Sequence, residues 1–194
     1  MLKIGVTGGI GSGKSIVCNV FKTLQIPVFE ADHEAKKIIQ QNVNVKHKLI
    51  SHFGEETFRA DGSYNTGYIS KIIFSDISGL QIINNIVHPY VKDKFIEWSN
   101  IQTAPYVIEE AAILFESGAD KHVDKVIMVY SEIDIRIERI RKRNGMTVQN
   151  IKKITETQMD ELEKCKLADF TIVNNEKTLL LPQILNIHNK ILNG

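Results

Sequence analysis

The sequence predicts an α/β fold in which a parallel sheet of about five strands is flanked by helices. Five short apolar runs have the length and residue types of buried strands, namely 2–7, 26–29, 106–108, 125–130 and 170–173. Most of the segments between them carry apolar residues at helical spacing. Strands that alternate with helices favour a parallel sheet that is covered on both faces.

The first two strands lie on either side of a predicted helix. Strand 2–7 runs into a glycine-rich segment, and residues 14–23 then have the apolar spacing of a helix that faces a core. The second strand has Pro27 at its start, where a missing N–H is tolerated. We expect the next helix to begin near His33.

The second half of the chain repeats this alternation. After strand 125–130, residues 133–143 predict a basic helix, which Asn144-Gly145 ends. A further helix is expected from about Val148, and a last helix follows the final strand. These helices supply the cover that a parallel sheet requires.

The middle of the chain, from about residue 40 to 100, is predicted to be helical and less regular. Its apolar stripe at helical spacing indicates packing, and consists of Ile82, Ile83, Ile86, Val87, Val91 and Phe95. Residues 61–67 have the composition of a turn, and Pro89 predicts a local interruption of its helix. This region is too long for a simple crossover between two strands, so we expect a helical insertion beside the sheet.

We therefore expect one domain over 1–194 with three parts. The core covers 1–35, 103–135 and 165–194, a helical insertion covers about 36–102, and a lid covers about 136–164.

Composition restricts the class of protein without identifying it. The net charge is +1, with 43% hydrophobic and 24% charged residues, as in an ordinary globular protein. Nothing in this balance requires nucleic acid or a membrane as a partner. No apolar run is long enough to span a bilayer, and we expect a soluble, cytoplasmic protein. Cys18 and Cys165 have no metal-ligand or redox spacing and are expected to be reduced thiols.

The glycine-rich segment after the first strand matches the P-loop motif in full. Gly8 is followed after four residues by Gly13-Lys14-Ser15, with a strand before the motif and a helix after it. Backbone N–H groups of such a loop surround phosphates, the lysine reaches the outer phosphates, and the serine hydroxyl holds Mg²⁺. The expected ATP-binding residues here are Gly9, Gly11, Ser12, Gly13, Lys14, Ser15 and Ile16, with Ser15 also as the metal ligand.

The loop indicates phosphate binding and leaves the reaction open. A GTPase switch normally adds Asp-x-x-Gly and Asn-Lys-x-Asp elements. Asp76-Ile77-Ser78-Gly79 fits the first, but within the helical middle region, and we interpret it as a chance match. The second does not occur in the sequence.

A small-molecule kinase also needs a carboxylate that orients the acceptor hydroxyl and takes its proton. Asp32 follows the second strand at the edge of the sheet where α/β proteins bind ligands, and Glu30 lies two residues earlier. Asp32 also precedes a predicted helix, where aspartate is a common cap. Position alone leaves both roles open, and the two are compatible.

Arginines on the predicted basic helix are candidates for a lid. Arg139 and Arg143 are four residues apart, and Arg136 lies one turn earlier on the same side. Such arginines neutralise charge on a transferred phosphate in kinases, whereas spacing alone also fits a solvated basic face. His88, beside Pro89, is more often a structural histidine than a catalytic one.

Together these segments resemble the dephospho-coenzyme A kinase family over nearly the whole chain. The start is very similar to the family's opening, and Glu30-Ala31-Asp32 stands where the family has Asp-Ala-Asp. The other matches, in family order, are Val87-His88-Pro89, Ile113-Leu114-Phe115-Glu116-Ser117-Gly118, Arg139-Ile140-Arg141-Lys142-Arg143, Gln158, Ala168-Asp169 and Asn174. It is their order and spacing that carry the resemblance.

The resemblance implies a P-loop kinase fold and transfer of the γ-phosphate of ATP to the ribose 3′-hydroxyl of dephospho-CoA. It implies Asp32 as the catalytic base, with Lys14 and Arg139 also catalytic and Arg143 near the phosphates of ATP. His88 would help to bind the substrate together with Asp32, and the insertion would bind the coenzyme A moiety.

Two positions depart from the family pattern. Glu30 replaces the first aspartate of its loop, and Ala112 stands where the family usually has proline. Two other classes of function are weighed against this one. The first is another P-loop kinase with a nucleoside, nucleotide or sugar-acid acceptor, and the second is a nucleotide-binding regulator without transfer activity.

Overall fold

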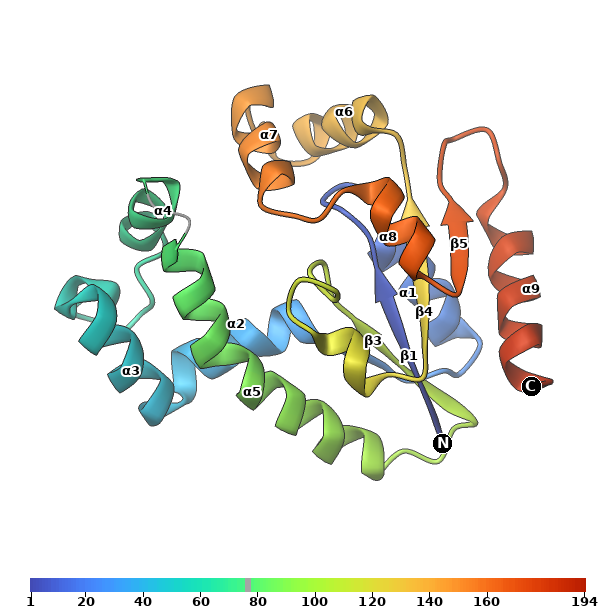
Figure 1. Ribbon diagram of the computed structural model, residues 1–194, viewed down its shortest axis with the longest axis horizontal. Coiled ribbons are helices and arrows are strands. Elements are labelled where there is room, and N and C mark those ends of the chain that lie inside the picture. The colour runs from blue at the N-terminus through green and yellow to red at the C-terminus, as the bar shows by residue number, and fades with distance from the viewer. Residues whose placement is uncertain (76–77) are drawn as a thin grey trace. The chain divides into compact units, whose positions relative to one another are not determined.

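The computed structural model describes residues 1–75 and 78–194 of the chain (Figure 1). Asp76 and Ile77, the first half of the GTPase-like match, lie outside the described residues. The chain forms two compact units, one made of 1–30 and 98–194 and the other of 31–97. The second unit begins and ends a few residues earlier than the insertion expected at about 36–102.

The first unit is built on a parallel sheet with strand order β2-β3-β1-β4-β5, which confirms the predicted α/β fold. Its strands are β1 Leu2–Thr7, β2 Val28–Glu30, β3 Tyr106–Glu110, β4 Lys125–Tyr130 and β5 Phe170–Val173. The central strand β1 pairs with β3 on one side and β4 on the other. The P-loop that follows β1 therefore starts from the middle of the sheet.

Two strands differ in extent from the prediction. The second strand begins at Val28. Pro27 has no N–H to donate to the sheet, although its carbonyl accepts from the N–H of Ile108 at 2.9 Å. The third extends past Ile108 to Glu110, which pairs in register with Glu30. Carboxylates thus stand at the carboxyl ends of two neighbouring strands.

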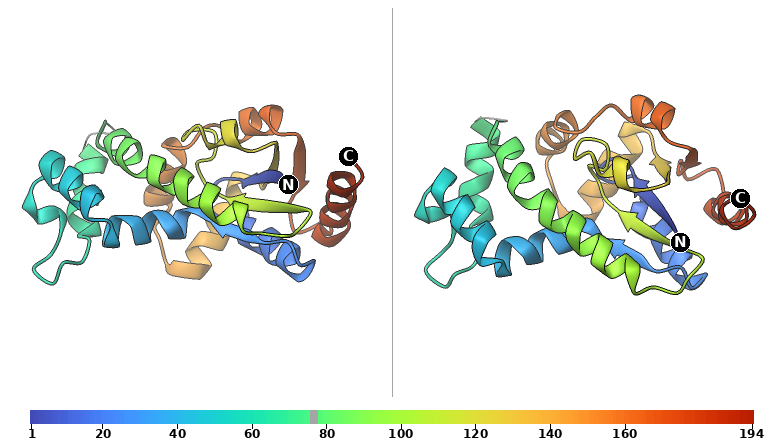
Figure 2. Two further views of the ribbon diagram at one scale, coloured as in Figure 1. Left: turned by 90° about the horizontal axis from the view of Figure 1, so that it is seen from below. Right: turned by 60° about the horizontal axis from the view of Figure 1, so that its bottom comes forward.

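Helices cover both faces of this sheet, as Figures 1 and 2 show. The helices of this unit are α1 Lys14–Thr23, α6 Ile133–Asn144, α7 Val148–Glu156, α8 Glu161–Leu167 and α9 Leu180–Leu192, with a short 3₁₀ helix η2 at Ala119–His122. Apolar residues of α1 and α9 pack on one face, around Phe21 and Ile187. On the opposite face α8 packs against β4.

The second unit is helical, as expected. It contains α2 Ala31–Gln41, α3 Val43–Phe53, the 3₁₀ turn η1 Glu55–Thr57, α4 Thr66–Ser75 and most of α5 Ser78–Asn100. The predicted turn is present, with the N–H of Ser63 donating to Asp61 Oδ1 at 2.9 Å, although Thr66 already belongs to α4.

Two predictions about these helices are wrong. The first helix begins at Ala31 and not near His33, so Asp32 lies inside its first turn. The expected interruption at Pro89 does not occur, because α5 continues through it. Buried residues on both sides, Val87 and Val91, belong to the predicted apolar stripe and hold the helix across the missing N–H.

Two further expectations concern the whole chain. Within 1–75 and 78–194, no helix is both long enough and apolar enough to cross a bilayer. Both cysteines are free, Cys18 buried in α1 and Cys165 half-buried in α8.

Candidate active site

The P-loop has glycines at positions 8, 11 and 13 whose backbone has positive φ. Gly8 has φ 153° and Gly13 has φ 95°, a range that residues with a Cβ rarely adopt. A Cβ on Gly8 would overlap the carbonyl oxygen of Val129, and one on Gly13 would overlap the side-chain amide of Asn174. The loop is therefore shaped by β4 on one side and by the segment after β5 on the other.

The remaining loop residues shape the start of α1. The N–H of Ser12 donates to the carbonyl of Gly9 at 3.1 Å, and the N–H of Ile16 donates to that of Gly13 at 3.0 Å. Gly11 packs closely against Ile140 of α6. The side chain of Ile16 is exposed.

Lys14 and Ser15 stand where the motif predicts. Lys14 Nζ donates to the carbonyl of Gly8 at 2.7 Å, and Ser15 Oγ donates to Glu110 Oε1 at 2.9 Å. Two adjacent carboxylates, Glu109 and Glu110, end strand β3. Glu109 is buried and paired with His122 Nε2 at 2.9 Å, so Glu110 is the carboxylate beside Ser15.

These oxygens suit magnesium bound together with a nucleotide. In the described part of the chain, no group of three or more His, Cys, Asp or Glu side chains could hold a metal ion. Mg²⁺ is usually held by one or two protein oxygens, with water and substrate phosphates completing its coordination. The Ser15 hydroxyl beside Glu110 fits that donor set.

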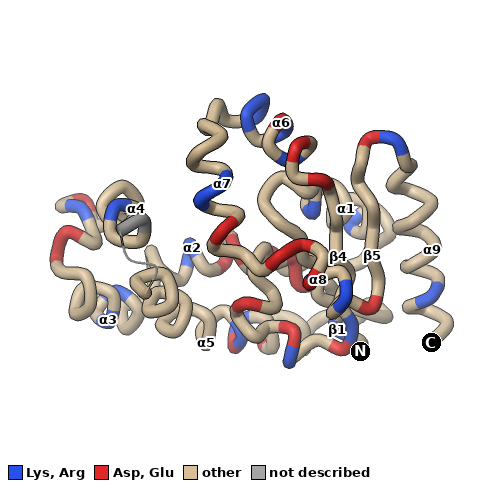
Figure 3. The backbone as a smooth tube through the Cα atoms, turned by 45° about the horizontal axis from the view of Figure 1, so that its top comes forward, with Lys and Arg blue, Asp and Glu red and all other residues tan. Residues whose placement is uncertain are grey.

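The three arginines of α6 differ in environment, although the sequence predicts one common face. Arg143 is exposed in the last turn, where Figure 3 shows basic residues gathered. Arg139 donates to both oxygens of Asn174, at 3.2 Å to the carbonyl and 3.1 Å to Oδ1, and pairs with Glu176 at 3.1 Å. The solvated-face interpretation thus fits Arg143 and is wrong for the other two.

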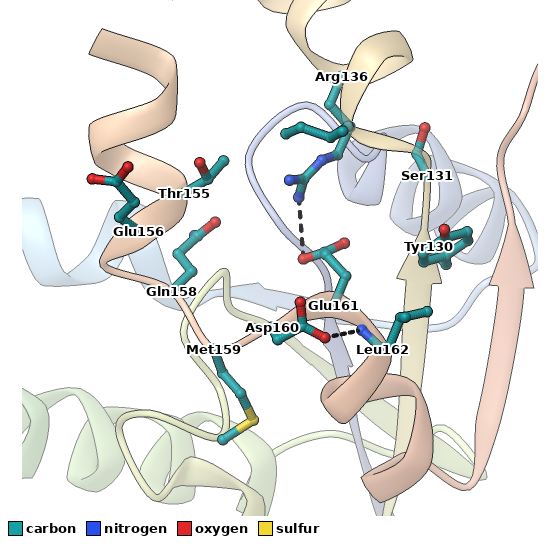
Figure 4. Close-up of a pocket in the computed structure, with 11 residues that line it drawn as sticks. Tyr130, Ser131, Arg136, Thr155, Glu156, Gln158, Met159, Asp160, Glu161 and Leu162 are labelled. Carbon is teal, nitrogen blue, oxygen red and sulfur yellow. Dashed lines mark hydrogen bonds and ion pairs between the residues drawn. The ribbon is translucent and has the colours of Figure 1, made fainter. Parts of the chain in front are cut away.

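Arg136 is almost fully buried, at 4% exposure. Its Nη1 lies 3.1 Å from Glu161 Oε1, and Figure 4 shows the two side chains pointing toward each other from α6 and α8. The pair lines a pocket of about 340 Å³ between α6, the end of α7 and the start of α8. Burial raises the pKa of Glu161, while Arg136 and Lys164 act in the opposite direction. Sequence reasoning missed Glu161, because no local pattern links it to Arg136.

Residues near the end of the chain support the P-loop from outside. Gln158 Oε1 accepts from the N–H of Ile10 at 3.2 Å, and the buried Asn174 Nδ2 donates to the carbonyl of Ser12 at 2.7 Å. Asp169 accepts from the N–H of Val126 at 2.7 Å and so joins β5 to β4. The sequence pattern marked these positions, but not what they contact.

In the second unit, Asp32 and His88 act on each other electrostatically. Burial lowers the pKa of His88, and the negative charge of Asp32 partly offsets this effect. Asp32 is exposed in the first turn of α2, so it is not the cap residue before the helix that sequence position allowed. The two residues expected to bind the acceptor therefore belong to one compact unit.

Comparison with known proteins decides the family. A family model for dephospho-CoA kinase matches residues 2–179. The chain belongs to the dephospho-CoA kinase family. Dephospho-CoA kinase of Bacteroides fragilis (strain YCH46) is 36% identical over 187 residues, which cover 96% of this chain and 91% of that protein. Family membership makes the chain an ATP-dependent phosphotransferase of coenzyme A biosynthesis, and the resemblance found in the sequence is confirmed.

Solved structures agree with this assignment. Dephospho-CoA kinase from Campylobacter jejuni covers 99% of this chain and 98% of its own, with a TM-score of 0.69 and 26% identity. TT1252 from Thermus thermophilus has a TM-score of 0.82 at 26% identity, covering 99% of this chain and 96% of its own. The predicted P-loop kinase fold is thereby confirmed.

Glu30 and Ala112, the two departures from the dephospho-CoA kinase pattern, each make a specific contact. Glu30 forms an ion pair with Lys22 at 2.6 Å on the exposed side of α1. The carbonyl of Ala112 accepts from the buried ammonium of Lys164 at 3.2 Å. A backbone contact of this kind does not depend on the side chain at 112, so alanine is compatible with it there.

Proposed function

We propose that this chain transfers the γ-phosphate of ATP to the 3′-hydroxyl of the ribose of dephospho-CoA, giving coenzyme A and ADP. The observation that carries the proposal is the P-loop, with Lys14 and Ser15 in place, in a chain whose family match extends over 2–179. ATP is the phosphate donor, and the second unit, 31–97, is the region that binds the coenzyme A moiety.

The phosphates of ATP would bind to the N–H groups of the loop. Lys14 now donates to a loop carbonyl, and the same ammonium can turn to the outer phosphates when they arrive. Ser15 would hold Mg²⁺, with Glu110 accepting from its water shell. When bound, Mg²⁺ neutralises charge on the β- and γ-phosphate oxygens.

Transfer forms one bond and breaks another. The 3′-oxygen bonds to the γ-phosphorus while the bond from that phosphorus to the β–γ bridging oxygen breaks, and ADP leaves with the electron pair. Asp32 accepts the proton of the hydroxyl and later releases it to water. The negative charge of Asp32 acts on His88, which supports the assignment of both to the acceptor, with Asp32 as the base and His88 as a binding residue.

The lid, about 136–164, would close over the phosphates and exclude water, which otherwise competes as the acceptor. Arg139 and Arg143 are the lid residues proposed to contact ATP. Arg139 already contacts Asn174, which in turn contacts the P-loop at Ser12, and this supports a place for it at the nucleotide.

The activity is tested by measuring ADP release from ATP and Mg²⁺ with dephospho-CoA, shikimate, gluconate or adenosine as the acceptor. We expect stimulation by dephospho-CoA alone, with a new 3′-phosphate identified by ³¹P NMR. ADP release that ignores dephospho-CoA would support a regulator, and equal stimulation by another acceptor would support a different kinase.

The role of the base is tested by Asp32→Asn, with Asp93→Asn as the matched exposed control in the same unit. Loss of general-base catalysis should lower turnover about 100-fold or more, because the hydroxyl proton has no acceptor. ATP affinity, measured by titration calorimetry, should stay close to that of the wild type. Turnover near the wild-type value in Asp32→Asn would contradict the assignment.

A further inference from the structure

The guanidinium of Arg136 packs directly on the backbone of the P-loop. A Cβ added to Gly9 would overlap Arg136 Nη1, and one added to Gly11 would lie 2.9 Å from the carbonyl oxygen of Arg136. A residue with a Cβ at position 9 would require the Arg136 guanidinium to move. A buried positive charge is thus held against the loop that binds phosphates.

In this structure the ion pair between Arg136 and Glu161 is poorly hydrogen-bonded. Arg136 Nη1 lies 3.1 Å from Glu161 Oε1, and the two side chains are 5% and 15% exposed. Yet Arg136 Nε and Nη1 make no hydrogen bond with any described residue, while the backbone of Gly9 offers a hydrogen bond to Glu161. A buried ion pair without such hydrogen bonds recovers little of its desolvation cost. The raised pKa of Glu161 agrees with this, since burial outweighs the attraction of Arg136.

The guanidinium of Arg139, by contrast, is well supplied with hydrogen-bond acceptors. Its Nη1 lies within 3.5 Å of the carbonyl oxygens of Gly11 and Ser12, and its Nη2 donates to Asn174. These contacts brace the outside of the loop and use most of the five N–H donors of the guanidinium. Arg139, proposed above to contact ATP, would do so by exchanging some of these contacts for the nucleotide.

We propose that Arg136 contacts the γ-phosphate of ATP, and that Glu161 is the counterion it leaves when the nucleotide binds. This rests on the proposed function in assuming that the loop binds ATP. Arginine suits the role, because its planar donors match phosphate oxygens and it keeps its charge when buried. The pocket beside the pair gives the Glu161 side chain room to turn away (Figure 4). Arg136 is then a catalytic residue and Glu161 a positioning residue.

The test compares the affinity of a non-hydrolysable ATP analogue with that of ADP, by titration calorimetry with Mg²⁺. Only the analogue carries a γ-phosphate, so the ratio of the two affinities isolates contacts to that group. In Arg136→Gln the analogue should bind about tenfold or more weakly, with little change for ADP, as expected for a hydrogen bond to a charged group. The exposed Arg141→Gln on the same helix should keep the wild-type ratio.

Because Arg136→Gln leaves Glu161 buried without its partner, that variant alone could fail to fold. The double variant R136Q/E161Q removes both charges at nearly equal volume and should restore the unfolding temperature. It should still lack the wild-type preference for the analogue. Glu161→Gln alone should increase the preference, since nothing then competes with the phosphate for Arg136.

A wild-type ratio in the double variant would overturn the inference and make the pair structural, and so would an unchanged ratio in Glu161→Gln. Neither measurement uses an acceptor. If dephospho-CoA were not phosphorylated, the proposed function would fail while the affinity ratios still tested Arg136. If dephospho-CoA were phosphorylated and the ratios did not change, only the present inference would fail.

Discussion

Replacement of Lys164 by methionine should destabilise the unit that contains the sheet. The Lys164 side chain is completely buried in α8, and its Nζ lies 2.8 Å from Glu116 Oε1 and 3.2 Å from the carbonyl of Ala112. Glu116 Oε1 also accepts from the N–H of Met159 at 2.8 Å. One ammonium therefore ties α8 to the segment that follows β3.

The expected loss of unfolding free energy follows from the groups that lose the Lys164 ammonium as a partner. Methionine fills a similar volume, so no large cavity forms, but Glu116 keeps only the Met159 N–H in place of its cation, and the Ala112 carbonyl loses a donor. Breaking a buried ion pair costs about 3–5 kcal/mol. Since the Glu116 side chain is 18% exposed and partly reached by water, we expect the lower end, about 3 kcal/mol. In a chain of this size that lowers Tm by roughly 6–12 °C.

Lys166→Met is the matched control on the same helix. Its side chain is 70% exposed and pairs with Glu163 at 2.6 Å, a surface ion pair that should contribute less than about 1 kcal/mol. The assay is urea unfolding followed by the fluorescence of Trp98, the single tryptophan, which belongs to the same unit as Lys164. Equal losses in the two variants, or a loss below about 1 kcal/mol for Lys164→Met, would refute the reasoning.

Two other variants test the P-loop support and the acceptor residues. Asn174→Ala removes the 2.7 Å bond to Ser12 and an acceptor of Arg139, so ATP should bind about tenfold more weakly, measured by calorimetry. An equal rise in KM for the acceptor would instead indicate general damage. The pKa of His88 is lowered in the folded protein, so the unfolded chain binds its proton more readily. Its contribution to the free energy of unfolding is therefore lost as pH falls below about 6.5. His88→Gln should flatten the pH dependence of the unfolding free energy between pH 5 and 7, and an unchanged slope, with exposed His47→Gln as the control, would contradict this.

Local patterns in the sequence were sufficient for the elements of the fold and for the P-loop. Apolar periodicity placed β1, β4 and β5 with the bounds that the structure has. The motif could single out Lys14 and Ser15 for the phosphates and the metal, because phosphate binding depends on a short continuous segment. The error at Pro89 arose because the packing of Val87 and Val91 outweighed the local preference of proline.

Only the tertiary structure separated side chains that the sequence treats alike. Arg136, Arg139 and Arg143 share one predicted helical face, yet the first is buried against Gly9, the second braces the P-loop and the third is exposed. Glu109 and Glu110 are likewise adjacent, but a strand directs consecutive side chains to opposite faces, so that Glu110 reaches Ser15 while its neighbour meets His122. Burial and pairing depend on segments far away in the chain, and no local spacing records which of them will meet.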